Sequence, residues 1–170
     1  MLVGVMSDSH DNMHNVERSA ELFNSEGVEL VIHLGDVIAP FIVRRMAEWL
    51  KARAVIVYGN NDGEKRLLRA AAEKAGYAIH EPPITLEIAG RKLLLAHGFG
   101  SKENTLTIVE ALAVSGRFDA VLYGHTHQAD NRSIGNTLIL NPGETYGYLY
   151  GKPSVALLDL ESFKARVVEL

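Results

Sequence analysis

Five short groups of metal-ligand residues are spread along the chain, and each group directly follows an apolar run. The groups read Asp8-Ser9-His10, Gly35-Asp36, Gly59-Asn60-Asn61-Asp62, His97-Gly98 and Gly124-His125-Thr126-His127. Their carboxylate, amide and imidazole groups suit Mn²⁺, Fe²⁺, Co²⁺, Ni²⁺ or Zn²⁺ better than Ca²⁺ or Cu⁺. Together the groups carry enough ligands for two divalent metal ions, of which Mn²⁺ is our first expectation.

Two of the groups carry ligands that are two positions apart. Asp8 and His10 have this spacing, and so do His125 and His127. Residues two apart on an extended segment point the same way, so each pair can address one cavity. The two histidines are the stronger signal, because two imidazoles on one face of an extended segment have no common structural purpose.

Two neighbouring cations need a ligand that can bind both. A carboxylate can do so, because each oxygen binds one cation and the negative charge offsets part of theirs. Asp36, between Gly35 and the turn toward Pro40, is the best candidate for this bridge. Two metals about 3.5–4 Å apart activate a water and neutralise phosphoryl oxygens, so the site suits phosphate ester hydrolysis without a side-chain nucleophile.

Apart from the group with His125 and His127, each group taken singly also has an ordinary structural explanation. Asp8 could begin a helix, Asp36 could belong to a simple turn, and Asn60 beside Gly59 could be a left-handed turn residue. The ordered set of five groups favours the metal site. The remaining histidines are expected to be structural, and they are His14, His33 and His80.

Hydrophobic periodicity predicts the elements that position these groups. In the first half, apolar runs alternate with helical patterns, which predicts a parallel sheet with right-handed crossovers. The strands are residues 2–6, 30–34 and 54–58, and the helices are residues 15–25, 40–50 and 64–75. Ligands bind beyond the carboxyl ends of the strands in such sheets, which is where the first three groups lie.

The second half changes to hairpins around one helix and one strand. The hairpins pair residues 84–88 with 92–96, 132–134 with 138–140, and 154–160 with 164–168, and the helix and strand are residues 104–114 and 120–123. Parallel units followed by hairpins predict two sheets packed face to face with helices outside. No linker interrupts the pattern, so we expect one domain over residues 1–170.

Composition narrows the class of protein. The net charge is −4 and no basic stripe is present, so specific nucleic-acid binding is not expected. The absence of cysteine excludes thiolate metal sites and fits a cytoplasmic location. The chain has no signal-peptide pattern and no apolar run near the roughly 20 residues that span a bilayer, so no membrane association is expected.

Five motifs of this chain resemble, in the same order, the motifs of the calcineurin-like metallophosphoesterases. They are Asp-x-His, Gly-Asp, Gly-Asn-x-Asp, His-Gly and Gly-His-Thr-His. Gly-Asn-Asn-Asp-Gly and Asn141-Pro142-Gly143 resemble more narrowly their small single-domain phosphodiesterase branch, whose fold a retromer subunit shares. The resemblance implies an α/β fold, a four-layer α/β/β/α sandwich of two packed mixed β-sheets flanked by helices. It also implies a metal-dependent phosphodiesterase, in which a hydroxide bridging two metals attacks a small phosphodiester substrate.

The resemblance further implies how the ligands divide between the two ions. One ion would be held by Asp8, His10, Asp36 and His127. The other would be held by Asp36, Asn60, His97 and His125. Asn61 and Asp62 are the candidate catalytic residues. Many relatives have a histidine at the position of Asn61, where it can protonate the leaving alkoxide, so this chain departs from the family pattern there.

Two other functions stay open. A protein-interaction scaffold with a vestigial site would be free to lose ligands, whereas this chain has kept all seven. A phosphomonoesterase is disfavoured by Asn61, because a monoester dianion benefits from protonation of its leaving group. The tyrosines at 146, 148 and 150 could line the substrate pocket, form the contact of a homodimer or higher homo-oligomer, or pack in the ordinary way.

Overall fold

The computed structural model describes residues 1–170, which form four helices and eleven strands. The chain order is β1 (Leu2–Met6), α1 (Met13–Ser25), β2 (Leu30–His33), α2 (Pro40–Trp49), β3 (Arg53–Val57), α3 (Lys65–Lys74), β4 (Ala78–His80), β5 (Ile84–Ile88), β6 (Arg91–Leu95), α4 (Lys102–Val114), β7 (Ala120–Leu122), β8 (Asp130–Ile134), β9 (Thr137–Asn141), β10 (Ser154–Asp159) and β11 (Lys164–Glu169).

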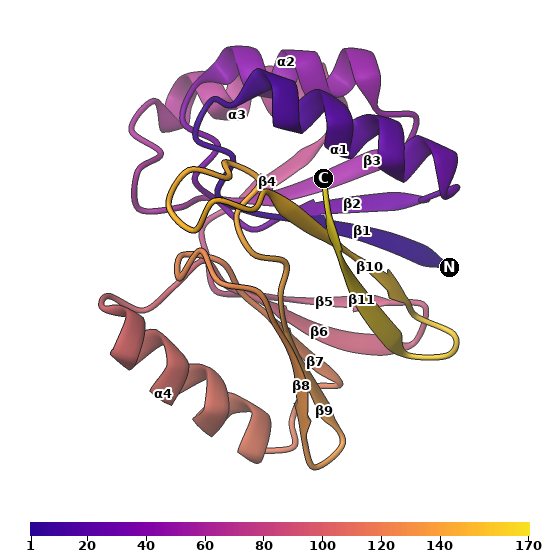
Figure 1. Cartoon of the computed structure of the whole chain (residues 1–170), viewed down its shortest axis with the longest axis vertical. Helices are drawn as coiled ribbons and strands as arrows, with labels where there is room; N and C mark the ends of the chain where they lie inside the picture. Colours follow the sequence, from indigo (N-terminus) through magenta and orange to yellow (C-terminus); the bar gives the residue numbers. More distant parts are fainter.

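The elements form four layers (Figure 1). The first sheet has the strand order β11-β10-β1-β2-β3-β4, and the second has the order β5-β6-β7-β9-β8. Both sheets are mixed, because parallel pairs such as β1–β2 and β6–β7 are flanked by antiparallel pairs such as β1–β10 and β5–β6. Helices α1, α2 and α3 cover the first sheet and α4 covers the second (Figure 1), so the predicted α/β/β/α sandwich is confirmed.

Alternating side chains hold the layers together. Val3 and Val5 of β1 and Leu93 of β6 belong to a cluster of 15 buried apolar residues contributed by both sheets. Leu94, the next residue of β6 after Leu93, points the other way and belongs to the cluster under α4. Successive residues of a strand face opposite sides, so a continuous apolar strand can serve two cores at once.

Strand register places the site loops side by side. Met6 at the end of β1 lies opposite His33 at the end of β2, and Leu95 of β6 lies opposite Leu122 of β7. The strands of each pair therefore end level with one another. The backbone continues this alignment past the strands, since the Asp8 N–H donates to the carbonyl of Gly35 over 3.0 Å.

Two helix starts differ from the sequence-based expectation in the same way. The helices were expected to begin at Asn15 and Asn104, but α1 begins at Met13 and α4 at Lys102. In each helix the asparagine donates its backbone N–H to the capping side chain, Asn12 or Ser101. The first turns carry little of the apolar face, so hydrophobic periodicity detects these helices two residues late.

One strand was not expected at all. Strand β4 has three residues, of which only Ile79 is buried, and it extends the first sheet beyond β3. Such a short edge strand carries almost no alternation to detect. None of the helices combines the length and the apolar character that crossing a membrane requires.

Candidate metal centre

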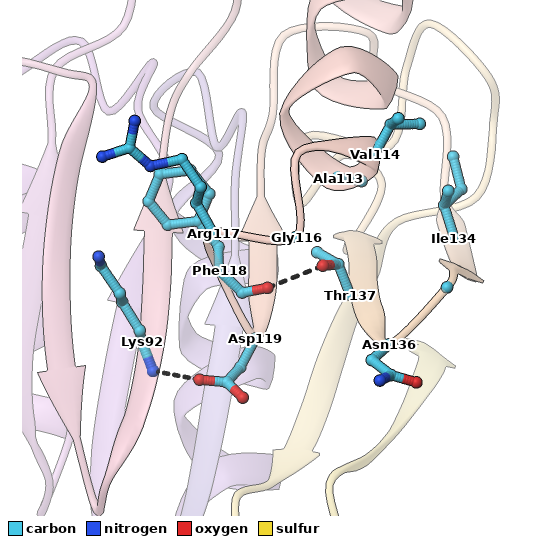
Figure 2. A pocket seen from close by; sticks show the side chains of 11 residues that line it. Lys92, Ala113, Val114, Gly116, Arg117, Phe118, Asp119, Ile134, Asn136 and Thr137 are labelled. Atoms are coloured by element: carbon cyan, nitrogen blue, oxygen red, sulfur yellow. Dashed lines mark hydrogen bonds between the residues drawn. The ribbon is translucent and has the colours of Figure 1, made fainter.

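The two ends of the strands in the second sheet carry different surfaces. At the end where β6, β7 and β9 begin, a pocket of about 530 Å³ is lined by Lys92, Arg117 and Thr137, among others (Figure 2). Two of its polar groups are paired within the protein: the backbone N–H of Lys92 donates to the Asp119 carboxylate, and the Thr137 hydroxyl donates to the carbonyl of Phe118. None of the predicted ligands lines this pocket. They lie at the opposite end of the strands.

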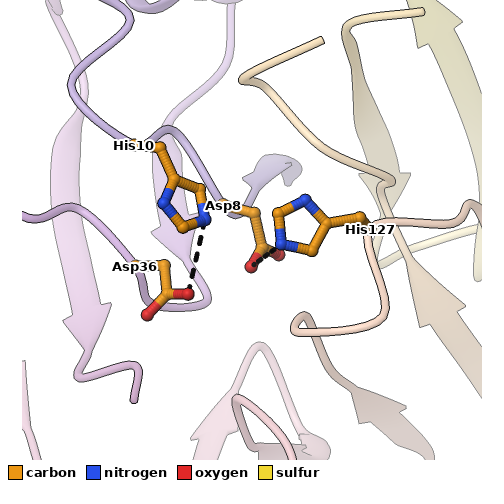
Figure 3. Close-up of side chains that lie close together, drawn as sticks. All are labelled: Asp8, His10, Asp36 and His127. Atoms are coloured by element: carbon orange, nitrogen blue, oxygen red, sulfur yellow. Dashed lines mark ion pairs between the residues drawn. The ribbon is translucent and has the colours of Figure 1, made fainter. Parts of the chain in front are cut away.

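At that opposite end, four predicted ligands converge from the loops after β1, β2 and β7 (Figure 3). Asp8, His10, Asp36 and His127 each offer one ligand atom, and these atoms all lie within 4.8 Å of one another. His10 Nε2 is 3.4 Å from Asp36 Oδ2, and His127 Nε2 is 3.4 Å from Asp8 Oδ1. These separations leave a space between nitrogen and oxygen lone pairs that suits a coordinated cation.

Two atoms of this cluster are buried without a hydrogen-bond partner. They are Asp8 Oδ1 and His10 Nε2. Buried polar atoms are nearly always paired, because leaving one unpaired costs about 1–3 kcal/mol. Burial also raises the pKa of Asp8, against the charges of His97 and His127. A divalent cation would satisfy both atoms and offset the buried charge, so the residues fit a metal ion.

Three further predicted ligands lie beside this cluster. His97 Nε2 is 3.0 Å from Asn60 Oδ1 and 3.5 Å from Asp36 Oδ2. The rings of His97 and His125 meet edge to face, with centroids 5.2 Å apart. Contacts therefore connect all seven predicted ligands, but only the first four form the tight cluster. Asn60, His97 and His125 line a neighbouring cleft of about 460 Å³.

Backbone carbonyls determine which ring nitrogen carries the proton in two of these histidines. His97 Nδ1 lies 2.7 Å from the carbonyl of Leu34, and His125 Nε2 contacts the carbonyl of Gly100. A carbonyl oxygen only accepts, so each of these nitrogens carries the proton. The other nitrogen of each neutral ring, Nε2 of His97 and Nδ1 of His125, is therefore the one that could bind a metal.

Asp36 and His97 also stabilise each other electrostatically. Burial alone would raise the pKa of Asp36, but the hydrogen bond and the charge of His97 hold it well below its usual value. Burial alone would lower the pKa of His97, but the hydrogen bond to Asp36 and the charges of Asp8 and Asp36 raise it. Positive charge next to Asp36 is thus favoured, whether a proton or a cation supplies it.

The glycines of the motifs leave room for the ligands. A Cβ on Gly59 would lie 2.1 Å from Asp36 Oδ1, and a Cβ on Gly124 would lie 2.1 Å from Ser7 Oγ and 2.9 Å from Asp8 Oδ2. Neither glycine has a positive φ, so its conformational freedom is not the reason for its presence. Each glycine is required by the close approach of a ligand-bearing loop.

Backbone strain is concentrated at the ligands. Nine non-glycine residues have a positive φ, and five of them are predicted ligands: Asp8 (51°), His10 (40°), Asp36 (56°), His125 (65°) and His127 (59°). Such conformations cost about 1–3 kcal/mol each and persist only where the surroundings hold them. Strain of this kind clusters at functional sites, which supports a functional reading of these loops.

The two candidate catalytic residues occupy different positions. Asn61 donates its backbone N–H and its side-chain amide to the two oxygens of Asp36. The carboxylate of Asp62 instead accepts from the backbone N–H groups of Asp36, Ile38 and Gly59, at 3.1, 2.7 and 2.7 Å. Asp62 is buried, and these contacts hold the loop after β2 against the loop after β3; its catalytic role stays a prediction.

Sequence reasoning missed Glu144. This buried residue lies 2.8 Å from His127 Nδ1 through Oε2, and its Oε1 accepts the backbone N–H of Tyr150 over 2.7 Å. The available signal was its place directly after Asn141-Pro142-Gly143. His33, expected to be structural, is buried, and its ring contacts the Ser9 hydroxyl and the Gly35 N–H.

The tyrosine stretch lies beside the cluster of predicted ligands. The Tyr146 ring is 5.3 Å from the His10 ring and 4.8 Å from the Tyr148 ring, measured between centroids. Tyr148 is 74% exposed and Tyr150 is 51% exposed. Ordinary packing therefore does not account for these two tyrosines, and the stretch forms an aromatic rim next to His10.

Comparison with known proteins agrees with this geometry. The family model of the calcineurin-like phosphoesterase superfamily domain matches residues 1–162. A phosphodiesterase of Methanocaldococcus jannaschii is 37% identical, with 100% of this chain and 99% of that protein covered. The solved structure of an archaeal phosphodiesterase aligns with a TM-score of 0.91 at 36% identity over 100% of both chains. Vps29 of Chaetomium thermophilum aligns with a TM-score of 0.72 over 100% of this chain and 96% of its own, but at 15% identity, so it shows the fold alone.

Proposed function

Because the chain belongs to the calcineurin-like phosphoesterase superfamily, we propose that it hydrolyses phosphate diesters with two divalent metal ions bound around Asp36. The family and the ligand cluster together support a metal-dependent phosphoesterase. The preference for diesters, the number of ions and the use of Mn²⁺ are parts of the proposal. The observation that carries it is the pair of buried, unpartnered atoms, Asp8 Oδ1 and His10 Nε2, within the cluster.

The position of Asp36 supports its part as the bridging ligand. Its Oδ2 lies 3.4 Å from His10 Nε2 and 3.5 Å from His97 Nε2, so it stands between the two ligand groups. One ion would bind Asp8, His10, Asp36 and His127, and the other would bind Asp36, Asn60, His97 and His125. The low pKa of Asp36 keeps it ionised, as a bridge between two cations requires.

The ions, when bound, would supply a nucleophilic water at neutral pH and positive charge against the phosphoryl oxygens. The chain's own residues hold the arrangement. Asn61 orients both oxygens of Asp36, and Asp62 ties the loop after β2 to the loop after β3 through backbone N–H groups. Asn61 is a neutral amide, so the leaving group departs without a proton from a side chain at this position.

The substrate we propose is a small phosphodiester. The cleft beside Asn60, His97 and His125 has a volume of about 460 Å³, which suits a small organic group. On the other side, the aromatic rim at Tyr146 and Tyr148 adjoins His10. A diester carries two organic groups, and the cluster has a surface available for each of them.

A protein-interaction scaffold is the second candidate. The exposed Tyr148, Leu149 and Tyr150 would suit a protein partner, since aromatic side chains are enriched at interfaces. The two candidates differ in what the metal does. A scaffold would tolerate loss of the ligands without loss of its function, whereas a phosphodiesterase would not.

A metal and substrate panel tests the proposal. The protein is stripped with a chelator, reconstituted separately with Mn²⁺, Ni²⁺, Co²⁺, Fe²⁺ and Zn²⁺, and assayed on bis(p-nitrophenyl) phosphate and p-nitrophenyl phosphate. We expect two ions per chain, diester hydrolysis that needs metal, and slower cleavage of the monoester. Hydrolysis of the monoester alone, or no metal bound, would overturn it.

A further inference from the structure

The carboxylate of Glu144 joins two parts of the site. Its Oε2 lies 2.8 Å from His127 Nδ1, and its Oε1 accepts the backbone N–H of Tyr150 over 2.7 Å. The side chain is buried, so water does not compete for these contacts. Glu144 therefore uses each oxygen for a different partner: one partner is a predicted metal ligand and the other belongs to the exposed aromatic segment.

The contact with His127 determines which nitrogen carries the proton. An ionised carboxylate only accepts hydrogen bonds, so His127 Nδ1 is the protonated atom. In the neutral ring, Nε2 then keeps its lone pair. That lone pair points toward Asp8, whose Oδ1 is 3.4 Å away and has no hydrogen-bond partner. The proton on Nδ1 is thus the condition for Nε2 to act as a ligand.

The backbone around Glu144 is held in place on both sides. The N–H of Ser154 donates to the Glu144 carbonyl over 3.0 Å, and the next residue, Thr145, donates its N–H to the carbonyl of Ser7 over 2.9 Å. The carboxylate is therefore carried by a backbone that is pinned to β10 and to the loop bearing Asp8. A carboxylate on such a fixed backbone can orient the His127 ring, because the carboxylate does not move when the ring moves.

We propose that Glu144 is a positioning residue that holds His127 in the tautomer able to bind metal, and that couples this ligand to the Tyr146–Tyr150 segment. The inference rests on the proposed role of His127 as a ligand. Carboxylates that orient metal-binding histidines typically change metal affinity about 10–100-fold when they are replaced. Glu144 itself contacts no reacting group, so its effect is exerted through His127.

The chain contains its own tautomer references. His97 Nδ1 donates to the Leu34 carbonyl, so His97 is protonated at Nδ1. His33 Nδ1 accepts from the Gly35 N–H, and its Nε2 donates to the Ser9 hydroxyl, so His33 is protonated at Nε2. Neither ring touches Glu144. One nitrogen-15 spectrum of the ring nitrogens thus contains, beside the signal of His127, a standard for the Nε2 tautomer in His33 and a ring with a protonated Nδ1 in His97.

The experiment replaces Glu144 in two ways. In Glu144→Gln the amide cannot accept from both His127 and Tyr150, because one of its two ends is a donor. In Glu144→Leu no acceptor remains. Spectra are recorded on the metal-free full chain, at a pH well above the usual histidine pKa of about 6.5, and Mn²⁺ affinity is measured by calorimetry. Glu48→Gln, an exposed change in α2 far from these contacts in the chain, is the matched control.

We expect the wild-type protein and Glu48→Gln to show His127 protonated at Nδ1. In Glu144→Leu the proton should move to Nε2, and Mn²⁺ affinity should fall about 10–100-fold, with the His33 and His97 signals unchanged. Glu144→Gln should show the same changes to a smaller or equal extent. Retention of the Nδ1 proton in Glu144→Leu, with Mn²⁺ affinity within about twofold of wild type, would overturn the proposal.

The failures of the two proposals can be told apart. If the wild-type chain binds no Mn²⁺, the proposed function fails, while the tautomer comparison in metal-free protein still decides the part played by Glu144. If metal binds but the tautomer of His127 does not depend on Glu144, only the positioning proposal fails.

Discussion

Asn61 donates one hydrogen bond to each oxygen of Asp36, over 2.8 Å from its backbone N–H and 2.7 Å from its side-chain amide. The residue at the position where many relatives place a histidine is therefore a support for the Asp36 carboxylate. It can orient Asp36, but a neutral amide cannot protonate a departing alkoxide. This relationship sets the first prediction.

Asn61→His should change how the rate depends on the leaving group. In the wild-type protein, kcat/KM for aryl diesters should fall steeply as the leaving-group pKa rises. An imidazolium can donate a proton, and general acids contribute about 10²–10⁴-fold, so the variant should help poor leaving groups most and flatten the slope. The measurement is kcat/KM across a series of aryl diesters with saturating Mn²⁺.

Asn61→Ala is the control for that series. It removes the hydrogen bond from the side chain to Asp36 without supplying an acid, so the rate should fall while the slope stays that of the wild type. Equal slopes in the wild type and in an active Asn61→His protein would mean that residue 61 does not stand beside the leaving group.

Asp36→Asn should abolish hydrolysis and leave the fold intact. The amide keeps the shape of the side chain but lacks the charge that two cations share, and the far-ultraviolet circular dichroism should be unchanged. The bound metal, measured by elemental analysis, should drop below two ions per chain. Retention of more than about a tenth of the wild-type rate would correspond to a rise in the activation barrier of less than roughly 1.4 kcal/mol. That result would show that Asp36 is not the bridging ligand.

Removal of metal should lower the melting temperature. A ligand that binds only the folded state at a hundredfold excess over its Kd adds about 2.7 kcal/mol, which corresponds to roughly 5–11 °C for a chain of this size. A chelator should produce this decrease and Mn²⁺ should reverse it, as followed by calorimetry. Asp36→Asn should show a smaller response, and an identical wild-type melt with and without chelator would count against the metal centre.

Gly59→Ala and Gly63→Ala form a matched pair four residues apart. A Cβ on Gly59 meets Asp36 at 2.1 Å, whereas a Cβ on Gly63 has no atom within 4 Å. Gly59→Ala should therefore displace Asp36, weaken Mn²⁺ binding and destabilise the fold by about 1–3 kcal/mol. Gly63→Ala should leave both properties nearly unchanged. Denaturant unfolding and Mn²⁺ titration measure the two effects, and equal behaviour of the two variants would contradict the close contact.

The fold was predictable where apolar runs alternate with helical periodicity. The run that contains Val3 and Val5 predicts a buried strand, and the βα rhythm of the first half predicts its parallel strands. The prediction failed at β4, which buries only Ile79. The attachment of β10 to β1 was also not predictable, because pairing between strands so far apart in the sequence depends on the assembled sandwich.

The site was predictable as a set of residue types and not as a set of contacts. The types and order of the ligands pointed to a metal centre, and the division of those ligands between two ions stays a prediction. The part played by Asp62 was not visible, because it depends on N–H groups of the loop after β2, including that of Asp36, 26 positions away. The contact between Glu144 and His127 was hidden for the same reason.

The cluster draws Asp8 and Asp36 from loops of the first sheet and His127 from a loop of the second. A cation bound there would clamp the two halves of the sandwich at one edge. A molecule whose sheets had separated would keep its individual strands and helices but would have no catalytic centre left. If the chain hydrolyses diesters at this cluster as proposed, the rate of hydrolysis would also report whether the two halves are docked, and heat or denaturant should abolish hydrolysis as soon as the two sheets separate.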